Sequence, residues 1–232
     1  MFLPMFNPMY YLFALPALLL GMYAQYKIRA TYNKYQQMRN RANMSGHEVA
    51  QRLLRLNGLT DVDVQEARGA LSDHYDPRRK QLFLSPGVAR SPSVASLGIV
   101  AHEVGHAMQD QQEYVPLRVR AGLVPVVRIG SWLGPILFLL GMFMATSNLA
   151  LIGLLLFSGT FVFSLVTLPV EYNASRRAVA MLNQAGLLTG QEEKATRQVL
   201  SAAALTYVAA AAQSLSTILY YLFLLGGVRR RD

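Results

Sequence analysis

The sequence of 232 residues contains no cysteine, which excludes a disulfide framework, a thiolate metal ligand and a cysteine nucleophile. Charge is also scarce, since Asp, Glu, Lys and Arg make up 15% of the chain, against about a quarter in soluble proteins. Hydrophobic residues make up 53% of the whole chain, and two stretches, 1–26 and 129–170, contain no charged residue at all. This segregation predicts a membrane protein with a separate polar portion.

Positive charge is concentrated in one segment. The formal net charge is +9, and 27–128 holds 15 of the 22 Lys and Arg residues against 9 acidic ones. Basic segments beside membrane spans are retained on the cytoplasmic side, where anionic lipids also attract them. We therefore expect 27–128 to face the cytoplasm. Binding of nucleic acid is not expected, because no helix pattern stacks basic and aromatic residues on one face.

Four apolar stretches are candidates for membrane spans. Residues 9–26 have aromatic side chains at both ends, as at a membrane interface, and they lack the basic start and cleavage site of a signal peptide. Residues 129–145 and 149–168 are joined by three residues, which predicts a tight hairpin. The last stretch, 201–228, either crosses the membrane or packs its alanine-rich half within the catalytic portion. We therefore expect a mainly α membrane protein with three to four transmembrane helices.

These patterns divide the chain into five parts. The expected parts are a transmembrane anchor (1–26), a catalytic portion (27–128), a transmembrane hairpin (129–168), a second catalytic portion (169–200), and a C-terminal apolar helix with a basic tail (201–232). Prolines at 116 and 125 predict a broken connector over 113–128, and Pro169 predicts the end of the hairpin.

The catalytic portion is predicted to hold short helices and a small β element. Ser45 and Glu48 have the spacing of a capping box, which opens a helix that Gly58 closes. Strand-like runs lie around 62–64 and 82–84. Between them, the polar segment 72–77 fits two interpretations equally well. One is a turn in which aspartates bond to backbone amides, and the other is a loop at the edge of a cleft.

The motif His102-Glu103-Val104-Gly105-His106 lies on a predicted amphipathic helix. Histidines four residues apart share one helix face, so both imidazoles can bind one metal ion. The intervening Glu103 lies where a carboxylate can accept a proton from water at the metal. Leu97, Val100 and Val104 form the opposite, apolar face. The pattern predicts a zinc site.

A catalytic zinc site needs a third protein ligand and an open position. The extended motif with a third histidine is excluded, because Gln109 and Gln112 occupy its glycine and histidine positions. Glu171 is the best-placed alternative, since it is the only charged residue between Arg128 and Arg176 and follows directly after the hairpin. Glu192 and Glu193 are expected to be solvated acids in the first turn of another helix.

The motif at 102–106, together with 168–175 after a hairpin, resembles the neutral zinc metallopeptidases of bacterial membranes, the YugP-like family. The segments 72–77 and 203–210 share this resemblance, which therefore covers nearly the whole chain. The glutamate segment is also similar to that of HtpX-type membrane proteases. The resemblance implies a zincin-like helical catalytic portion in a bacterial inner membrane protein. The basic charge of 27–128 leads us to expect its active site on the cytoplasmic side. It further implies His102, His106 and Glu171 as zinc ligands and Glu103 as the base.

The sequence leaves the outer contacts of the site open. HtpX-type proteins have an aspartate four residues after the ligand glutamate, which is expected to orient a metal histidine. This chain has Ser175 at that position, and Asn173 is a second candidate for the same role. The oxyanion needs a further donor. Candidates for this donor are His74, Tyr75, Tyr172, Tyr207 and, ranked lower, Arg176 and Arg177. His74, Tyr75 and Tyr207 are also candidates for substrate binding.

The function that follows is a membrane-embedded zinc endopeptidase that cleaves protein or peptide substrates, associated with the membrane or facing the cytoplasm, in quality control or processing. An alternative is an inactive scaffold that binds partner membrane proteins. A transporter ranks last, because the 129–168 hairpin contains no charged residue. The chain's own pattern is compatible with a homo-oligomer as well as with partner membrane proteins.

Overall fold

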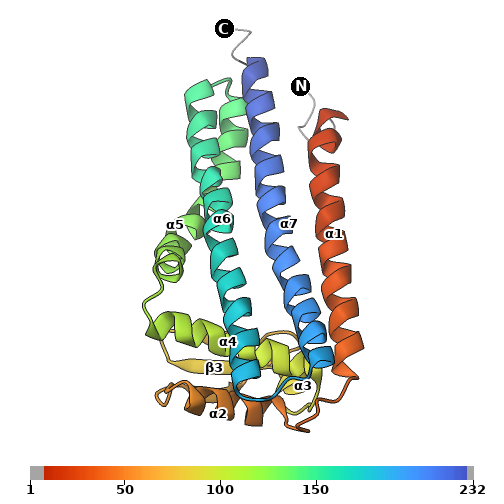
Figure 1. The fold of residues 1–232 in the computed structure, drawn as a ribbon. Coiled ribbons are helices and arrows are strands. Elements are labelled where there is room, and N and C mark those ends of the chain that lie inside the picture. The colour runs from red at the N-terminus through yellow and green to blue at the C-terminus, as the bar shows by residue number, and fades with distance from the viewer. Residues whose placement is uncertain (1–7, 229–232) are drawn as a thin grey trace. The chain divides into compact units, whose positions relative to one another are not determined.

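The structure is a computed structural model that describes residues 8–228 and is mainly helical. The elements, in chain order, are α1 (Pro8–Gln36), α2 (Gly46–Leu56), β1 (Asp63–Glu66), β2 (His74–Asp76), β3 (Gln81–Leu84), α3 (Pro86–Ala89), α4 (Val94–Gln111), α5 (Val115–Phe143), α6 (Ser147–Gln184) and α7 (Gly190–Val228) (Figure 1). The expected fold class is therefore confirmed, whereas the predicted basic tail at 229–232 lies outside the described residues.

The chain forms two compact units. Within the described residues, the helical unit consists of 8–25, 119–168 and 206–228, and the sheet unit consists of 26–118 and 169–205. Each unit is thus assembled from segments that are distant in sequence.

Three helices of the described part of the chain are long and apolar enough to cross a membrane, namely α5, α6 and the 190–227 part of α7. Helix α1, described from Pro8 onward, is not among the three. The hairpin and the C-terminal apolar stretch of the sequence thus lie in candidate spans, and the anchor over 1–26 stays a prediction.

The helical unit is held together by aromatic stacking and by close helix contacts. The ring of Phe138 in α5 is fully buried and stacks on Tyr221 of α7, with ring centroids 3.9 Å apart. Helices α5 and α6 approach each other through glycines. A Cβ atom placed on Gly153 would lie 2.6 Å from the carbonyl oxygen of Gly134 and even nearer to the backbone nitrogen of Phe138. Small residues at such crossings are typical of membrane helix pairs.

This crossing leads to a test of the α5–α6 contact. We expect Gly153→Ala to destabilise the protein by about 1–3 kcal/mol, because the added methyl group overpacks two backbones that cannot move aside independently. The matched control is Gly159→Ala in the same helix, where the nearest atom to an added Cβ is a side-chain methyl of Val127 at 3.8 Å. Thermal unfolding in detergent measures both variants. Equal melting temperatures would contradict the close crossing.

The sheet unit contains a three-stranded sheet in the order β1-β3-β2. Strand β1 pairs with β3 in parallel, and β2 pairs with β3 in antiparallel orientation. The two predicted strands are confirmed, but the sequence missed β2. Of the two interpretations of 72–77, the one with aspartates bonded to amides describes the contacts correctly. The backbone amide of Arg78 donates to Asp76 over 2.9 Å, and that of Ser85 donates to Asp73 over 2.8 Å.

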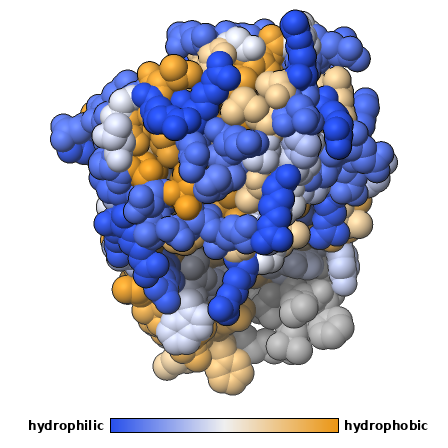
Figure 2. Space-filling model, turned by 90° about the horizontal axis from the view of Figure 1, so that it is seen from below, coloured by the Kyte–Doolittle hydropathy of each residue, from blue (hydrophilic) through white to orange (hydrophobic). Residues whose placement is uncertain are grey.

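The core of the sheet unit lies between α2, α4 and the sheet. Fully buried side chains fill it from each element, including Val49, Leu53, Leu82, Leu97 and Val104. The predicted capping box at the start of α2 is present, since Ser45 and Glu48 accept each other's backbone N–H groups. The face on the side of α2 is mostly hydrophilic, with smaller hydrophobic areas between the polar side chains (Figure 2). This unit thus has the polar surface expected of a portion exposed to water.

Two predicted breaks are wrong. The segment 113–128 is helical from Val115 onward, because Pro116 lies in the first turn of α5, where its missing N–H has no helical partner to lose. Helix α6 continues through Pro169 as far as Gln184. The helix that was expected to start near Glu192 and the apolar stretch after 201 form one continuous helix, α7.

Candidate metal centre

Helix α4 positions the motif histidines. It begins after Ser93, whose side chain accepts the backbone N–H of Ser96 and thereby caps the helix. Its apolar face, including Leu97, Val100 and Val104, is completely buried in the core of the sheet unit. Packing of this face turns the opposite side of α4, with His102 and His106, toward α6.

Glu171 lies against both histidines. One oxygen of its carboxylate, Oε2, is 3.1 Å from Nε2 of His102 and 3.6 Å from Nε2 of His106. The carboxylate is almost completely buried, with 2% of the side chain exposed. Among the described residues, these three side chains are the one group of at least three His, Cys, Asp or Glu whose ligand atoms gather, all within 4.8 Å of one another.

The three side chains fit a zinc ion. Zinc lies about 2.0–2.2 Å from nitrogen and oxygen ligands, so tetrahedral ligand atoms are roughly 3.4 Å apart. The observed separations of 3.1 and 3.6 Å are close to this value. In addition, a buried carboxylate is costly unless a cation or hydrogen-bond donors compensate it. Two neutral nitrogens and one oxygen are also the donor set of many catalytic zinc sites.

A glycine inside the motif permits the close approach of α4 and α6. A Cβ atom on Gly105 would lie 2.8 Å from the backbone carbonyl oxygen of Ala174, closer than real Cβ atoms come. The two helix backbones therefore touch at this point, one turn from Glu171 on α6. This contact brings the glutamate within reach of both histidines.

The other ring nitrogen of each histidine also has a partner. Nδ1 of His102 is 3.2 Å from the hydroxyl oxygen of Ser175, and Nδ1 of His106 is 3.0 Å from Oε1 of Gln109. The Oδ1 atom of Asn173 accepts a hydrogen bond from Gln109. Sequence reasoning missed Gln109, although it lies one turn after His106 on the same helix, within reach of that ring.

The charge around His106 is negative. Burial lowers the pKa of His106, but the nearby carboxylates of Glu171 and Glu103 outweigh it, so the pKa is raised overall. Glu103 itself is half-buried on α4 and is not one of the three gathered side chains. The site therefore combines two histidines with two carboxylates, an arrangement that favours a cation.

Two of the remaining predicted candidates have partners within the sheet unit. The ring of His74 stacks on Phe83, with centroids 4.8 Å apart, and the hydroxyl of Tyr75 donates to Asp110 over 2.8 Å. Burial and this hydrogen bond raise the pKa of Tyr75. Tyr207 lies in α7 and belongs to the helical unit.

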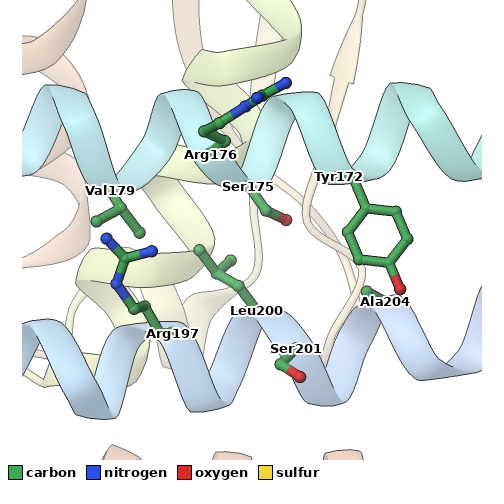
Figure 3. A pocket seen from close by; sticks show the side chains of 8 residues that line it. All are labelled: Tyr172, Ser175, Arg176, Val179, Arg197, Leu200, Ser201 and Ala204. Atoms are coloured by element: carbon green, nitrogen blue, oxygen red, sulfur yellow. The ribbon is translucent and has the colours of Figure 1, made fainter.

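A cavity of about 530 Å³ lies between the sheet-unit portions of α6 and α7. Its lining includes Tyr172 and Ser175 from α6 and Arg197 and Leu200 from α7 (Figure 3). Because Ser175 contacts His102, the cavity adjoins the candidate metal centre.

The expectation for Glu192 was wrong. Its side chain is 3% exposed, and it accepts hydrogen bonds from the backbone amides of Arg41 and Thr189 over 2.7 and 2.8 Å. It joins two segments of the sheet unit and is not a solvated acid.

Comparison with known proteins agrees with this geometry. A family model described as "Putative neutral zinc metallopeptidase" matches residues 10–226. A relative from Bacillus subtilis (strain 168), named "Putative membrane protease YugP", is 43% identical over 208 residues, which cover 90% of this chain and 92% of the relative. No solved structure matches the chain. Since the family model matches nearly the whole chain, this protein belongs to the neutral zinc metallopeptidase family.

Proposed function

We propose that this protein is a membrane-embedded zinc endopeptidase with His102, His106 and Glu171 as its metal ligands. The observation that carries the proposal is the convergence of these three side chains, from two helices, within 4.8 Å. Family membership and the candidate spans support it. Zinc held there would polarise the scissile carbonyl and lower the pKa of a coordinated water.

The protein's own acid–base group is Glu103. Its carboxylate lies on the same helix as the two histidines and close enough to His106 to influence the charge of that ring. We assign it the role of accepting a proton from the attacking water and delivering it to the leaving amine. Tyr75 is disfavoured as the oxyanion donor, because its hydroxyl is already bonded to Asp110.

The proposed substrates are proteins in the membrane or facing the cytoplasm, cleaved in quality control or processing. A strain that carries Glu103→Ala should accumulate the uncleaved forms of these proteins, and comparison of its membrane proteins with those of the wild type identifies them. The alternative, an inactive scaffold, predicts the opposite result. The Glu103→Ala strain would then keep the wild-type phenotype and the wild-type set of membrane proteins.

The topology can be tested because the chain has no cysteine of its own. We expect a cysteine in place of Arg79, a 70% exposed side chain in the basic segment, to resist a membrane-impermeant thiol reagent in intact cells. Its matched partner is Thr146→Cys in the exposed turn between α5 and α6, which should react from outside. Both should react after lysis. The reverse pattern in intact cells would invert the proposed orientation.

A further inference from the structure

A line of hydrogen bonds leads from the surface of the sheet unit to His106. Nε of Arg177 donates to Oδ1 of Asn173 over 2.7 Å, and Nε2 of Gln109 donates to the same oxygen over 3.0 Å. Oε1 of Gln109 then lies 3.0 Å from Nδ1 of His106. Gln109 is completely buried, so this line connects α4 and α6 through the interior.

The direction of each hydrogen bond in this line is fixed by chemistry. Arginine has only donors, so the Asn173 atom that faces Arg177 must be its oxygen. That oxygen can only accept, and the Gln109 atom that faces it must therefore be the NH₂ group. The remaining Gln109 atom, directed at His106, is then the carbonyl oxygen.

A second contact fixes the Gln109 amide independently. Its Nε2 also donates to the backbone carbonyl oxygen of Val170 over 2.9 Å, and a carbonyl oxygen can only accept. Both partners of the NH₂ group thus require the same orientation. A flipped amide would leave two buried acceptors facing an oxygen, which is unfavourable.

We infer that Gln109 is the positioning residue of His106. Because the carbonyl oxygen of Gln109 can only accept, Nδ1 of His106 must carry the hydrogen. In the neutral ring, the lone pair then lies on Nε2, the nitrogen directed toward Glu171 at 3.6 Å. This inference rests on the proposed zinc site, where Nε2 would be the ligand atom.

The two histidines differ in whether their hydrogen-bond partner selects one tautomer of the ring. His102 faces the hydroxyl of Ser175, which can donate as well as accept, so that contact does not select a tautomer. His106 faces an amide whose orientation is fixed on two sides. The amide also supplies no charge, so it orients His106 without adding a third carboxylate beside Glu103 and Glu171. Gln109, which occupies the glycine position of the extended three-histidine motif, thus acquires a function in orienting His106.

The first experiment compares zinc affinities of purified variants by competition with a chelator. Gln109→Met keeps the volume but removes all three hydrogen bonds, and we expect a roughly 10–100-fold loss of affinity, as for other contacts behind a metal ligand. The control is Gln111→Met on the exposed side of the same helix, which should bind zinc like the wild type.

A third variant separates positioning from packing. Gln109→Glu keeps an acceptor for His106 but loses both donated hydrogen bonds, so it should be less stable than Gln109→Met and yet bind zinc more tightly. A merely structural role predicts that zinc affinity follows stability. Equal affinities of wild type and Gln109→Met, or an affinity order that matches the order of melting temperatures, would overturn the inference.

A metal-free measurement distinguishes the failure of this inference from the failure of the proposed zinc site. With ¹⁵N-labelled histidine there are four rings to assign. At alkaline pH, the His106 ring of the wild type should carry its hydrogen on Nδ1, and Gln109→Met should lose that preference. An unchanged tautomer in Gln109→Met would overturn the inference, whether or not zinc binds. A wild type that binds no zinc would overturn the proposed function alone.

Discussion

Glu103→Ala should lower the rate of peptide cleavage by about 10²–10⁴-fold, the usual contribution of a positioned acid–base group. The metal should stay bound, because the three gathered side chains are His102, His106 and Glu171 and do not include Glu103. Cleavage of casein or a labelled peptide by the zinc-loaded protein in detergent measures the rate. Metal content is measured on the same sample.

The matched control for this experiment is Glu113→Ala. Glu113 lies just after α4 and its carboxylate is exposed, in an ion pair with Arg118 that is itself exposed. Such surface pairs contribute little to stability. The control should therefore cleave at the wild-type rate. Wild-type cleavage by Glu103→Ala would eliminate Glu103 as the base and require another proton acceptor.

The second large effect is expected for Glu171→Ala, which should abolish cleavage and weaken zinc binding beyond the roughly 100-fold limit typical of an outer contact. The variant leaves two histidines, half of a tetrahedral site, and removes the carboxylate oxygen that lies near both rings. Chelator competition gives the affinity. Adding excess zinc tests whether any activity returns.

Two further variants sharpen this result. Glu171→Gln keeps the shape of the side chain but removes its charge, and it should also bind zinc weakly. Glu193→Gln alters a carboxylate that pairs with Arg197 on α7, and it should bind zinc normally. Glu192 is unsuitable as a control, because it is buried and joins two segments. If Glu171→Ala held zinc as tightly as the wild type, the third ligand would have to be another residue.

Local sequence signals predicted the parts of the fold that depend on local chemistry. The capping box of Ser45 and Glu48 is such a signal, because its two hydrogen bonds form within one helical turn. The helix of the metal-binding motif is another, since its histidines and its apolar residues both follow the periodicity of an α-helix. Long uncharged runs similarly predicted the hairpin, because hydrocarbon excludes charge along its whole thickness.

Helix ends could not be predicted from proline alone. Pro169 removes one backbone hydrogen bond, a loss that neighbouring helices can compensate in a membrane protein. Its effect therefore depends on packing that the sequence does not display. Strand β2 was missed for a related reason, since three polar residues form a strand only because β3 lies beside them.

The candidate site was predictable in its ligands but not in the contacts behind them. Gln109 appeared in the sequence only as a departure from the three-histidine pattern. Its role depends on Val170 and Asn173, more than sixty residues away along the chain. A position that violates a motif is thus a reasonable place to look for a substitute function.

The uninterrupted course of α6 and α7 restricts how the length of this protein can vary. Each helix passes from one unit into the other without a loop, α6 between residues 168 and 169 and α7 between 205 and 206. An α-helix turns by about 100° per residue, so deleting one residue of α6 before Pro169 would change the helical phase of every later residue of that helix, including Glu171, by that angle. A change of seven residues, close to two full turns, would nearly restore the original helical phase of these residues. Insertions and deletions should therefore collect in the loops of the sheet unit, while the helices that carry the chain between units keep their length in steps of whole turns.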